Sequence, residues 1–296
     1  MNTGSNMSGQ PVSIQWFPGH MAKTRRIMQS SLKLVDLVVE LRDARIPRSS
    51  RNPEIEKLLG GKKRVVLLNK SDMADPQITK KWLAALEQEE IPAFAADCRS
   101  GKGLSAFYPL VRKTLSELTA RRRAKGMVNA PMRLMVAGVP NVGKSSLINR
   151  LCAGSRVKVE DRPGVTRGKQ WVSLKDGVEL LDMPGVLWPK FEDKLVGEHL
   201  AFTGAVKDNI IDTETLAARL LERLAADYPK LLNARYKLGG EQDGFGLLTQ
   251  IARGRGMLLP GGQINTERAA IIVLDEFRGG VIGRISLETP GSGDSL

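Results

Sequence analysis

The chain has 296 residues, enough for two domains that bury their cores without covalent staples. Its only cysteines, Cys98 and Cys152, lie far apart and outside any CxxC or Cys/His pattern, which argues against a disulfide framework and a metal cluster. No apolar run approaches the ~18 residues that span a bilayer, and the start of the chain is polar. We therefore predict a cytoplasmic bacterial protein with no membrane span.

The formal net charge is +13, from 45 Lys and Arg against 32 Asp and Glu. A domain this basic attracts polyanions by releasing their counterions, so nucleic acid is the expected partner. The cations gather in clusters, which favours RNA or DNA contact over a generic basic surface. The clusters are Lys23–Arg26, Lys62–Arg64, Arg121–Lys125 and Arg253–Arg255.

A polar leader at 1–13, which we expect to be disordered, is followed by an α/β pattern at 14–205. Short apolar runs alternate there with helical stretches, which predicts a mostly parallel six-stranded sheet flanked by helices. The predicted strands are Leu37–Leu41, Arg64–Leu68, Ala93–Ala96, Arg133–Ala137, Trp171–Leu174 and Glu179–Leu181. The predicted helices are Met21–Lys33, Pro53–Leu59, Pro76–Gln88, Leu104–Ala124, Lys144–Leu151 and Leu195–Phe202.

After Val206 the pattern becomes helical, and we expect a small all-helical domain at 206–289 before a flexible tail at 290–296. The stretch Thr213–Asp227 places its leucines on one face, as an amphipathic helix does. Two later helices are predicted at Gly244–Arg253 and Asn265–Arg278, the second opened by a capping-type sequence at Asn265.

A phosphate-binding loop is predicted at Gly138–Ser145, where GVPNVGKS matches GxxxxGKS between a predicted strand and a predicted helix. Lys144 would neutralise the β- and γ-phosphate oxygens, and the Ser145 hydroxyl would bind Mg²⁺. The loop and the first turn of the helix would also present backbone N–H groups to the phosphates. These donors are expected at Val142, Gly143, Lys144, Ser145 and Ser146.

The base specificity is predicted by Asn69–Asp72, an NKSD sequence directly after a predicted strand. Its side chains emerge at the carboxyl edge of the sheet, where ligands bind in such folds. The Asp72 carboxylate can accept hydrogen bonds from guanine N1–H and from its exocyclic amine, whereas adenine offers neither donor. Asn69 would contact the other edge of the base and the Lys70 stem would cover its face. The expected ligands are therefore GTP and GDP.

Four further residues complete the predicted site. Asp182, at the start of the DMPG sequence, would join the Mg²⁺ shell through water, and the Gly185 N–H would meet the γ-phosphate. In the loop Arg162–Arg167, Thr166 is the candidate second hydroxyl ligand of Mg²⁺, although a plain surface loop stays open. The N–H of Cys98, in the loop after the third strand, is placed to contact the guanine oxygen.

The motif order is circularly permuted, because Asn69–Asp72 precedes Gly138–Ser145. The termini of compact domains often lie close together, so such a permutation keeps the fold and changes only where the chain begins and ends within it. The segment after Gly185 then runs almost directly into the helical domain. Loss of the γ-phosphate is therefore expected to reorient that domain.

The sequence resembles the circularly permuted GTPases of the ribosome biogenesis GTPase A family over about residues 14–288. The resemblance rests on the motif order and on Trp16–Met21, Asp43–Pro47 and Val186–Pro189. It implies a GTPase that assists late assembly of the large (50S) ribosomal subunit, with a helical domain that contacts rRNA. The Asp97-Cys98 pair departs from the Ser-Ala pair usual in the family.

Hydrolysis without help is expected to be slow. Ras-like enzymes orient water with a Gln that here is replaced by Val186. The resemblance points to His20 as the replacement, with a surface or capping histidine as the alternative. His199 is expected to lie on a helix with no chemical role. Asn141 resembles the residue that binds K⁺ in potassium-stimulated GTPases, and a plain loop asparagine would look the same.

We expect a monomeric GTP hydrolase that the ribosome stimulates. Two other functions stay open at this point. A non-catalytic RNA-binding scaffold could keep the nucleotide for stability alone, which the missing Gln would permit. An ATP-using phosphotransferase is the third, and Asn69–Asp72 argues against it.

Overall fold

The computed structural model describes residues 19–153, 159–160, 171–182, 193–206, 212–240 and 243–291, with the backbone alone at 19–25, 54 and 159–160. The expected leader and most of the expected tail lie outside this range. No helix within it is both long and apolar enough to cross a bilayer. No group of His, Cys, Asp or Glu side chains in the same range is arranged to hold a metal ion.

The sheet has the strand order β3-β2-β1-β4-β7-β6-β5, and its first five strands are parallel. This confirms the mostly parallel sheet, to which the two-residue β5 adds a seventh strand at the antiparallel edge. The strands are β1 (Leu37–Asp43), β2 (Lys63–Asn69), β3 (Ala93–Ala95), β4 (Met132–Gly138), β5 (Val159–Glu160), β6 (Trp171–Ser173) and β7 (Val178–Asp182).

Helices cover both faces of the sheet, and successive residues along β1 and β2 are therefore buried on both sides. Val38 and Val66 face α1, α2 and α3, while Val39 and Val65 face α4 and α6. The helices of this part are α1 (Gly19–Leu32), α2 (Pro53–Leu59), α3 (Pro76–Gln88), α4 (Phe107–Thr114), α5 (Ser116–Ala124) and α6 (Lys144–Cys152). Short 3₁₀ turns lie at Leu104–Ala106 and Lys175–Gly177.

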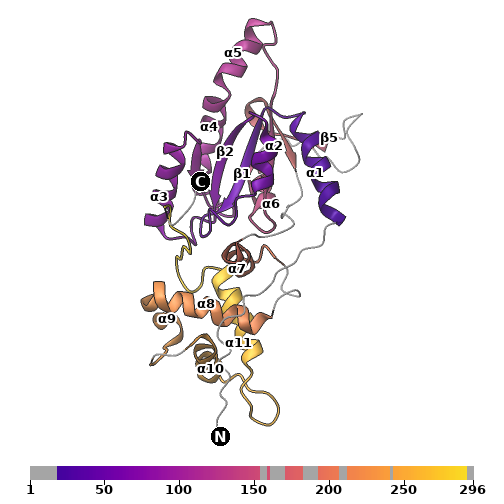
Figure 1. Cartoon of the computed structure of the whole chain (residues 1–296). Helices are drawn as coiled ribbons and strands as arrows, with labels where there is room; N and C mark the ends of the chain where they lie inside the picture. Colours follow the sequence, from indigo (N-terminus) through magenta and orange to yellow (C-terminus); the bar gives the residue numbers. More distant parts are fainter. Residues whose placement is uncertain are drawn as a thin grey trace.

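The helix predicted as one piece over Leu104–Ala124 is interrupted at Leu115. Leu115 is buried in the core and its backbone leaves helical geometry, with φ −98° and ψ 9°. Beyond this break α5 buries none of its residues and projects from the sheet domain (Figure 1). The core contact that ends α4 therefore also releases α5 into solvent.

The remaining helices are α7 (Lys194–Phe202), α8 (Thr213–Asp227), α9 (Pro229–Tyr236), α10 (Gly244–Gly254) and α11 (Thr266–Arg278). The predicted apolar face of α8 is buried against α10 and α11. The Asn265 side chain accepts a hydrogen bond from the Arg268 N–H, which confirms the predicted cap. Helix α9 was not predicted, because it buries only Leu232 and so shows little periodicity. Its start is a proline at the first helical position.

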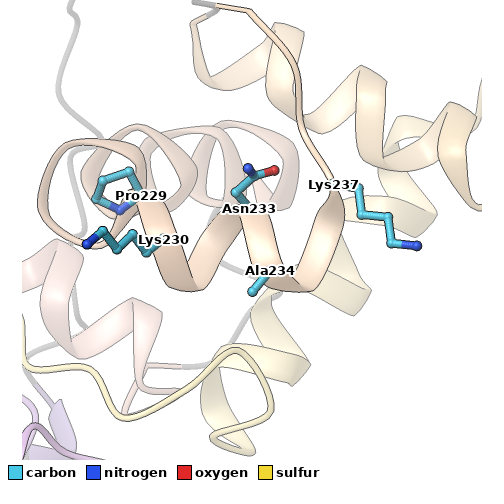
Figure 2. A pocket seen from close by; sticks show the side chains of 5 residues that line it. All are labelled: Pro229, Lys230, Asn233, Ala234 and Lys237. Atoms are coloured by element: carbon cyan, nitrogen blue, oxygen red, sulfur yellow. The ribbon is translucent and has the colours of Figure 1, made fainter.

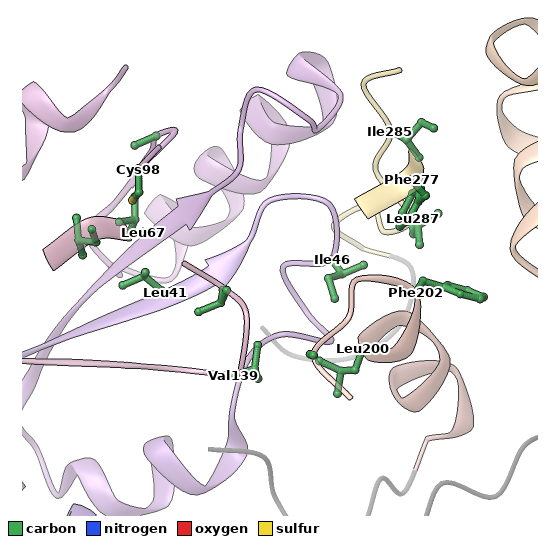
Figure 3. Close-up of a cluster of buried hydrophobic side chains, with 14 of the residues drawn as sticks. Leu41, Ile46, Leu67, Cys98, Val139, Leu200, Phe202, Phe277, Ile285 and Leu287 are labelled. Carbon is green, nitrogen blue, oxygen red and sulfur yellow. The ribbon is translucent and has the colours of Figure 1, made fainter. Parts of the chain in front are cut away.

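The helical part lies against the carboxyl edge of the sheet (Figure 1). Ile46, in the loop after β1, belongs to the same buried cluster as Leu200 of α7 and Phe277 of α11 (Figure 3). After α11 the chain returns to the sheet domain, where Ile285 and Leu287 join that cluster. A continuous apolar core thus connects the two parts at the edge where a ligand site is expected.

Candidate nucleotide-binding site

The parallel strands bring the predicted motifs to one edge of the sheet. In the strand register Asp43 lies beside Asn69, Leu41 beside Gly138, and Val136 beside Asp182. Ligands of open α/β sheets bind outside this carboxyl edge. The guanine motif, the phosphate loop and the DMPG sequence therefore start from neighbouring strand ends, although they are far apart in the chain.

The phosphate loop connects β4 to α6, and Lys144 is the first residue of that helix. Gly143 precedes it with φ +105°, a conformation that L side chains rarely adopt. A Cβ at this position would lie 2.2 Å from Asn69 Nδ2. Glycine is thus required twice, once by the backbone of the loop and once by its close approach to the guanine motif.

The Lys144 ammonium is held at the phosphate loop by the loop's own backbone. Its Nζ donates to the carbonyl oxygens of Gly138 at 3.1 Å and Val139 at 2.9 Å. An ammonium group has three donors, so one stays available for an anion. Burial lowers the pKa of Lys144 to about 8, and the Asp182 carboxylate opposes this shift. Asp182 at the end of β7 thus acts on the same charge that would bind phosphate.

Two further predicted phosphate contacts lie at the N-terminus of α6. Ser145 and Ser146 are exposed there, whereas Val142 packs into the core with 1% exposure. The buried Val142 fixes the loop, and the two serines lie exposed in the first turn of the helix. This arrangement suits an anion at the helix N-terminus.

Asn69 joins three loops with one buried side chain. Its Nδ2 donates to the Val142 carbonyl oxygen at 2.7 Å, and its Oδ1 accepts the Cys98 N–H at 2.9 Å. The Cys98 N–H therefore supports Asn69, a different contact from the one to a guanine oxygen that we expected. The Cys98 side chain is packed in the core, where burial and Asp97 raise the pKa of its thiol to about 12.

Lys70 is fixed by a carboxylate that the sequence did not single out for the site. Its Nζ lies 3.0 Å from Asp43 Oδ2, and Asp43 is also paired with Arg45 at 2.8 Å. Burial by itself would raise the pKa of Asp43, but the two cations outweigh it and hold the pKa well below its usual range. The only signal for Asp43 and Arg45 was their place in the Asp43–Pro47 segment. Asp72, two residues beyond Lys70, is exposed at the loop surface.

Asn141 connects the phosphate loop to the helical part. Its backbone has φ +57°, and its Nδ2 donates to the Gly204 carbonyl oxygen at 2.6 Å. Gly204 lies two residues beyond the end of α7. The carboxamide oxygen of Asn141 is the atom that a potassium ion would need, and the contact to Gly204 uses only the nitrogen.

Not every predicted site residue can be placed. Thr166 and Gly185 lie outside the described residues, and His20 is described only by its backbone. Helix α1 begins at Gly19, so His20 lies in its first turn and not ahead of the helix as expected. Figure 1 shows the N-terminal end of α1 on the side of the sheet where the strands carry their carboxyl ends.

His199 has a structural contact that the sequence did not reveal. It lies on α7 with 1% exposure, and its Nδ1 is 2.8 Å from Glu288 Oε1 and 3.1 Å from Ser49 Oγ. Glu288 also accepts the N–H groups of Arg48 and Ser49. This buried polar cluster joins α7, the loop after β1 and the segment after α11.

Comparison with known proteins identifies the family. The family model described as "50S ribosome-binding GTPase" matches residues 133–227. The chain is 46% identical over 286 residues to Ribosome biogenesis GTPase A of Priestia megaterium, covering 96% of this chain and 99% of the relative. Because this similarity extends over nearly the whole of both chains, it shows the family, and the two alternatives without GTP hydrolysis are set aside.

Two solved structures agree with this result. The GDP-bound structure of TM YlqF superposes with a TM-score of 0.67 at 28% identity, over 89% of this chain and 98% of that one. The crystal structure of GNP-bound YlqF from T. maritima gives a TM-score of 0.65 at 28% identity, over 91% and 99%. The protein is therefore a GTP hydrolase and belongs to the ribosome biogenesis GTPase A family.

Proposed function

We propose that this GTPase binds one guanine nucleotide between Asn69–Asp72 and Gly138–Ser145 and hydrolyses GTP during late assembly of the large (50S) ribosomal subunit. The observation that carries the site is the 2.7 Å hydrogen bond from Asn69 Nδ2 to the Val142 carbonyl oxygen. It ties the base-recognition loop, Asn69–Asp72, directly to the phosphate loop. One ligand with a base at one end and phosphates at the other suits this pair of loops.

Mg²⁺ would be held by Ser145, Thr166 and, through water, Asp182. Hydroxyl and carboxylate oxygens are the ligands that this ion prefers. The described members of this set fit it, because Ser145 is exposed in the first turn of α6, directly after Lys144, and Asp182 acts electrostatically on the Lys144 ammonium. When bound, the ion would neutralise charge that develops on the phosphate oxygens.

Slow intrinsic hydrolysis follows from the residue after the DMPG sequence. Val186 has no group that can orient a water molecule. We propose that His20 supplies this function once the ribosome moves the start of α1 toward the γ-phosphate. The N-terminal end of α1 lies on the side of the carboxyl edge, which supports the proposal (Figure 1). The Gly185 N–H and the Thr166 hydroxyl would sense the γ-phosphate.

The RNA contact would use cations that the fold leaves exposed. In the cluster Lys62–Arg64, Lys62 Nζ donates to the Val35 carbonyl and Lys63 pairs with Glu117, so these cations already have partners. On α5, Arg122 is tied to Asp36 at 2.7 Å, which anchors the helix. Three cations near the end of α5 are exposed and form no ion pair within the described residues. They are Arg121, Arg123 and Lys125.

Helix α9 offers a second basic surface on the helical part. A shallow hollow of about 700 Å³ lies along it, with Lys230 and Lys237 near its two ends (Figure 2). Both lysines are exposed and form no ion pair in the described part of the chain. Arg255, in contrast, pairs with Glu276 at 2.9 Å. Polyanion binding to α5 and α9 would hold the molecule at two places far apart.

We also propose that the protein acts as a cytoplasmic monomer and that the Asn141 oxygen serves as a ligand for K⁺. The contact to Gly204 uses only the nitrogen of the Asn141 carboxamide, which supports the oxygen as a ligand for K⁺. Measuring GTP turnover in K⁺ and in Na⁺ at equal ionic strength tests it. Equal rates in the two salts would contradict the proposed potassium site.

The ribosomal function is tested by phosphate release from GTP with and without purified large subunits. We expect strong stimulation by the subunits and loss of that stimulation in His20→Ala, with nucleotide binding retained. A turnover that the subunits leave unchanged would contradict the proposal. If the subunits stimulate His20→Ala as strongly as the parent protein, only the role of His20 is contradicted.

A further inference from the structure

The segment after α11, Val281–Glu288, crosses from the helical part back to the sheet domain, and we call it the strap. Ile282, Ile285 and Leu287 are buried in the core that the two parts share. The Leu287 N–H donates to the Arg45 carbonyl oxygen at 2.8 Å. The strap is therefore docked along its length and does not hang free as a linker.

The far end of the strap is held by several hydrogen bonds. The Trp82 indole N–H donates to the Glu288 carbonyl oxygen at 3.0 Å. The Glu288 carboxylate accepts from the N–H groups of Arg48 and Ser49, and it also meets His199. A carboxylate with this many partners in a buried position holds its segment in one place.

The middle of the strap contacts the loop that carries Asp72. Arg284 Nη2 donates to the Ser71 carbonyl oxygen at 2.9 Å, and its Nε donates to the Ala74 carbonyl oxygen at 3.0 Å. The Ile285 N–H donates to the Met73 carbonyl oxygen at 2.9 Å. These three hydrogen bonds go to the residues on both sides of Asp72. They use backbone atoms of the loop, so the Asp72 side chain stays available for a ligand.

The other end of the guanine motif is tied to α11 by a second route. Lys70 is paired with Asp43, Asp43 with Arg45, and Arg45 Nη1 donates to the Phe277 carbonyl oxygen at 3.0 Å. The Arg45 guanidinium also lies 5.1 Å from the centre of the Phe277 ring. Both ends of Asn69–Asp72 are thus connected to the end of α11 and the strap that follows it.

From these contacts we infer that the strap is a positioning element for the guanine base, with Arg284 as the positioning residue. The inference rests on the proposed assignment of Asp72 to the base. A carboxylate on a loop accepts two hydrogen bonds from guanine only if the loop backbone is held in place. Because the strap starts at the helical part, the docking of that part sets the affinity for guanine nucleotides.

The test is the dissociation rate of a fluorescent GDP from the full-length protein. Arg284→Ala removes two hydrogen bonds to the loop, and we expect dissociation about 3- to 10-fold faster. KM for GTP should rise more than kcat falls, because the hydrogen bonds of Arg284 go to the guanine loop, whereas those of Lys144 go to the backbone of its own phosphate loop. Arg284→Lys can restore one of the two bonds and should give an intermediate rate.

Arg278→Ala is the matched control. Arg278 also donates to two backbone carbonyl oxygens, those of Phe202 and Ala201, and both bonds lie between α11 and α7 within the helical part. Its GDP dissociation should match the parent protein. An unchanged rate in Arg284→Ala, or an equal acceleration in both variants, would overturn the inference. Asp72→Asn separates the two proposals, since undiminished guanine preference in that variant would overturn the base assignment itself.

Discussion

The Asn69 side chain donates to the Val142 carbonyl oxygen at 2.7 Å, and this bond joins the base-recognition loop to the phosphate loop. The two residues stand far apart in the sequence, in an order that is reversed relative to the usual GTPases. Their strands, β2 and β4, both flank β1. The parallel sheet thus restores a nucleotide site that the permuted chain order separates.

Exchanging Asp72 for asparagine should change the base that is recognised. A carboxamide at this position presents an N–H where the carboxylate accepted one, so the amine of guanine loses its acceptor. We expect GTP affinity to fall by roughly 100-fold or more, and xanthine nucleotides, which carry an oxygen in place of that amine, to gain affinity. Competition binding with GTP, XTP and ATP measures this change. A variant that still prefers GTP would place the base elsewhere.

Gly143→Ala should abolish nucleotide binding. The added methyl group would lie 2.2 Å from Asn69 Nδ2 and would occupy a backbone with φ +105°. Asn69 would have to leave Val142, which separates the two loops. Gly126→Ala is the control, since it also has positive φ, +76°, but nothing within 4 Å. The control should cost about 1–2 kcal/mol of unfolding free energy and leave GDP binding unchanged in a titration.

Nucleotide binding should take up protons near pH 8. The pKa of Lys144 is lowered by burial to about 8, so at that pH about half of the free molecules carry a neutral amine. Phosphate favours the charged ammonium, and binding should therefore take up about half a proton at pH 8 and almost none at pH 6. Calorimetric titration with GDP in two buffers of different ionisation enthalpy gives this number. Equal proton uptake at both pH values would contradict it.

The lowered pKa of Lys144 also makes the stability of the protein depend on pH. The pKa of Lys144 in the folded state lies below its ordinary value of 10.5. Between pH 8 and 10.5 the unfolded chain binds more protons than the folded chain at this residue. Its contribution to the free energy of unfolding therefore rises with pH through that window. Chemical denaturation of the parent protein and of Lys144→Met at several pH values measures this contribution. The free energy of unfolding of the variant should lack the part of the pH dependence that comes from Lys144.

Glu288→Ala should destabilise the junction between the two parts. The change leaves the N–H groups of Arg48 and Ser49 without their buried acceptor and removes one of the two partners of His199. We expect a loss of roughly 2–4 kcal/mol in the free energy of unfolding. Glu117→Ala, whose side chain is 70% exposed in its pair with Lys63, is the control and should change stability by less than about 0.5 kcal/mol. Equal losses in the two variants would argue against a buried anchor.

Removing the two lysines of α9 should weaken binding to the large subunit. Lys230→Gln with Lys237→Gln should lower affinity and reduce the slope of log affinity against log salt by about 2 or less. Turnover without ribosomes should stay the same. Lys80→Gln with Lys81→Gln, two exposed cations of α3, is the matched control. If both pairs reduce the slope equally, the contact depends on total charge and not on α9.

The sequence predicted the strand ends and the motifs because both depend on local patterns. Buried parallel strands are short apolar runs, and the phosphate loop has a fixed spacing before its helix. It did not predict α9, which has only Leu232 buried, or the break at Leu115, which depends on packing. The contribution of Asp43 and Arg45 to the site was not predicted either, because their partners Lys70 and Phe277 are distant in the chain. Contacts between remote segments, such as Arg284 to Ser71, leave no local pattern.

The central claim is that one guanine nucleotide is held by Asp72 at its base and by Lys144 at its phosphates. A crystal structure of the protein with a non-hydrolysable GTP analogue and Mg²⁺ tests it most directly. We expect the guanine N1–H within hydrogen-bonding distance of the Asp72 carboxylate and the β- and γ-phosphate oxygens of the same molecule beside Lys144 Nζ. A nucleotide whose phosphates lie on Lys144 while its base is bound away from Asp72 would contradict the claim.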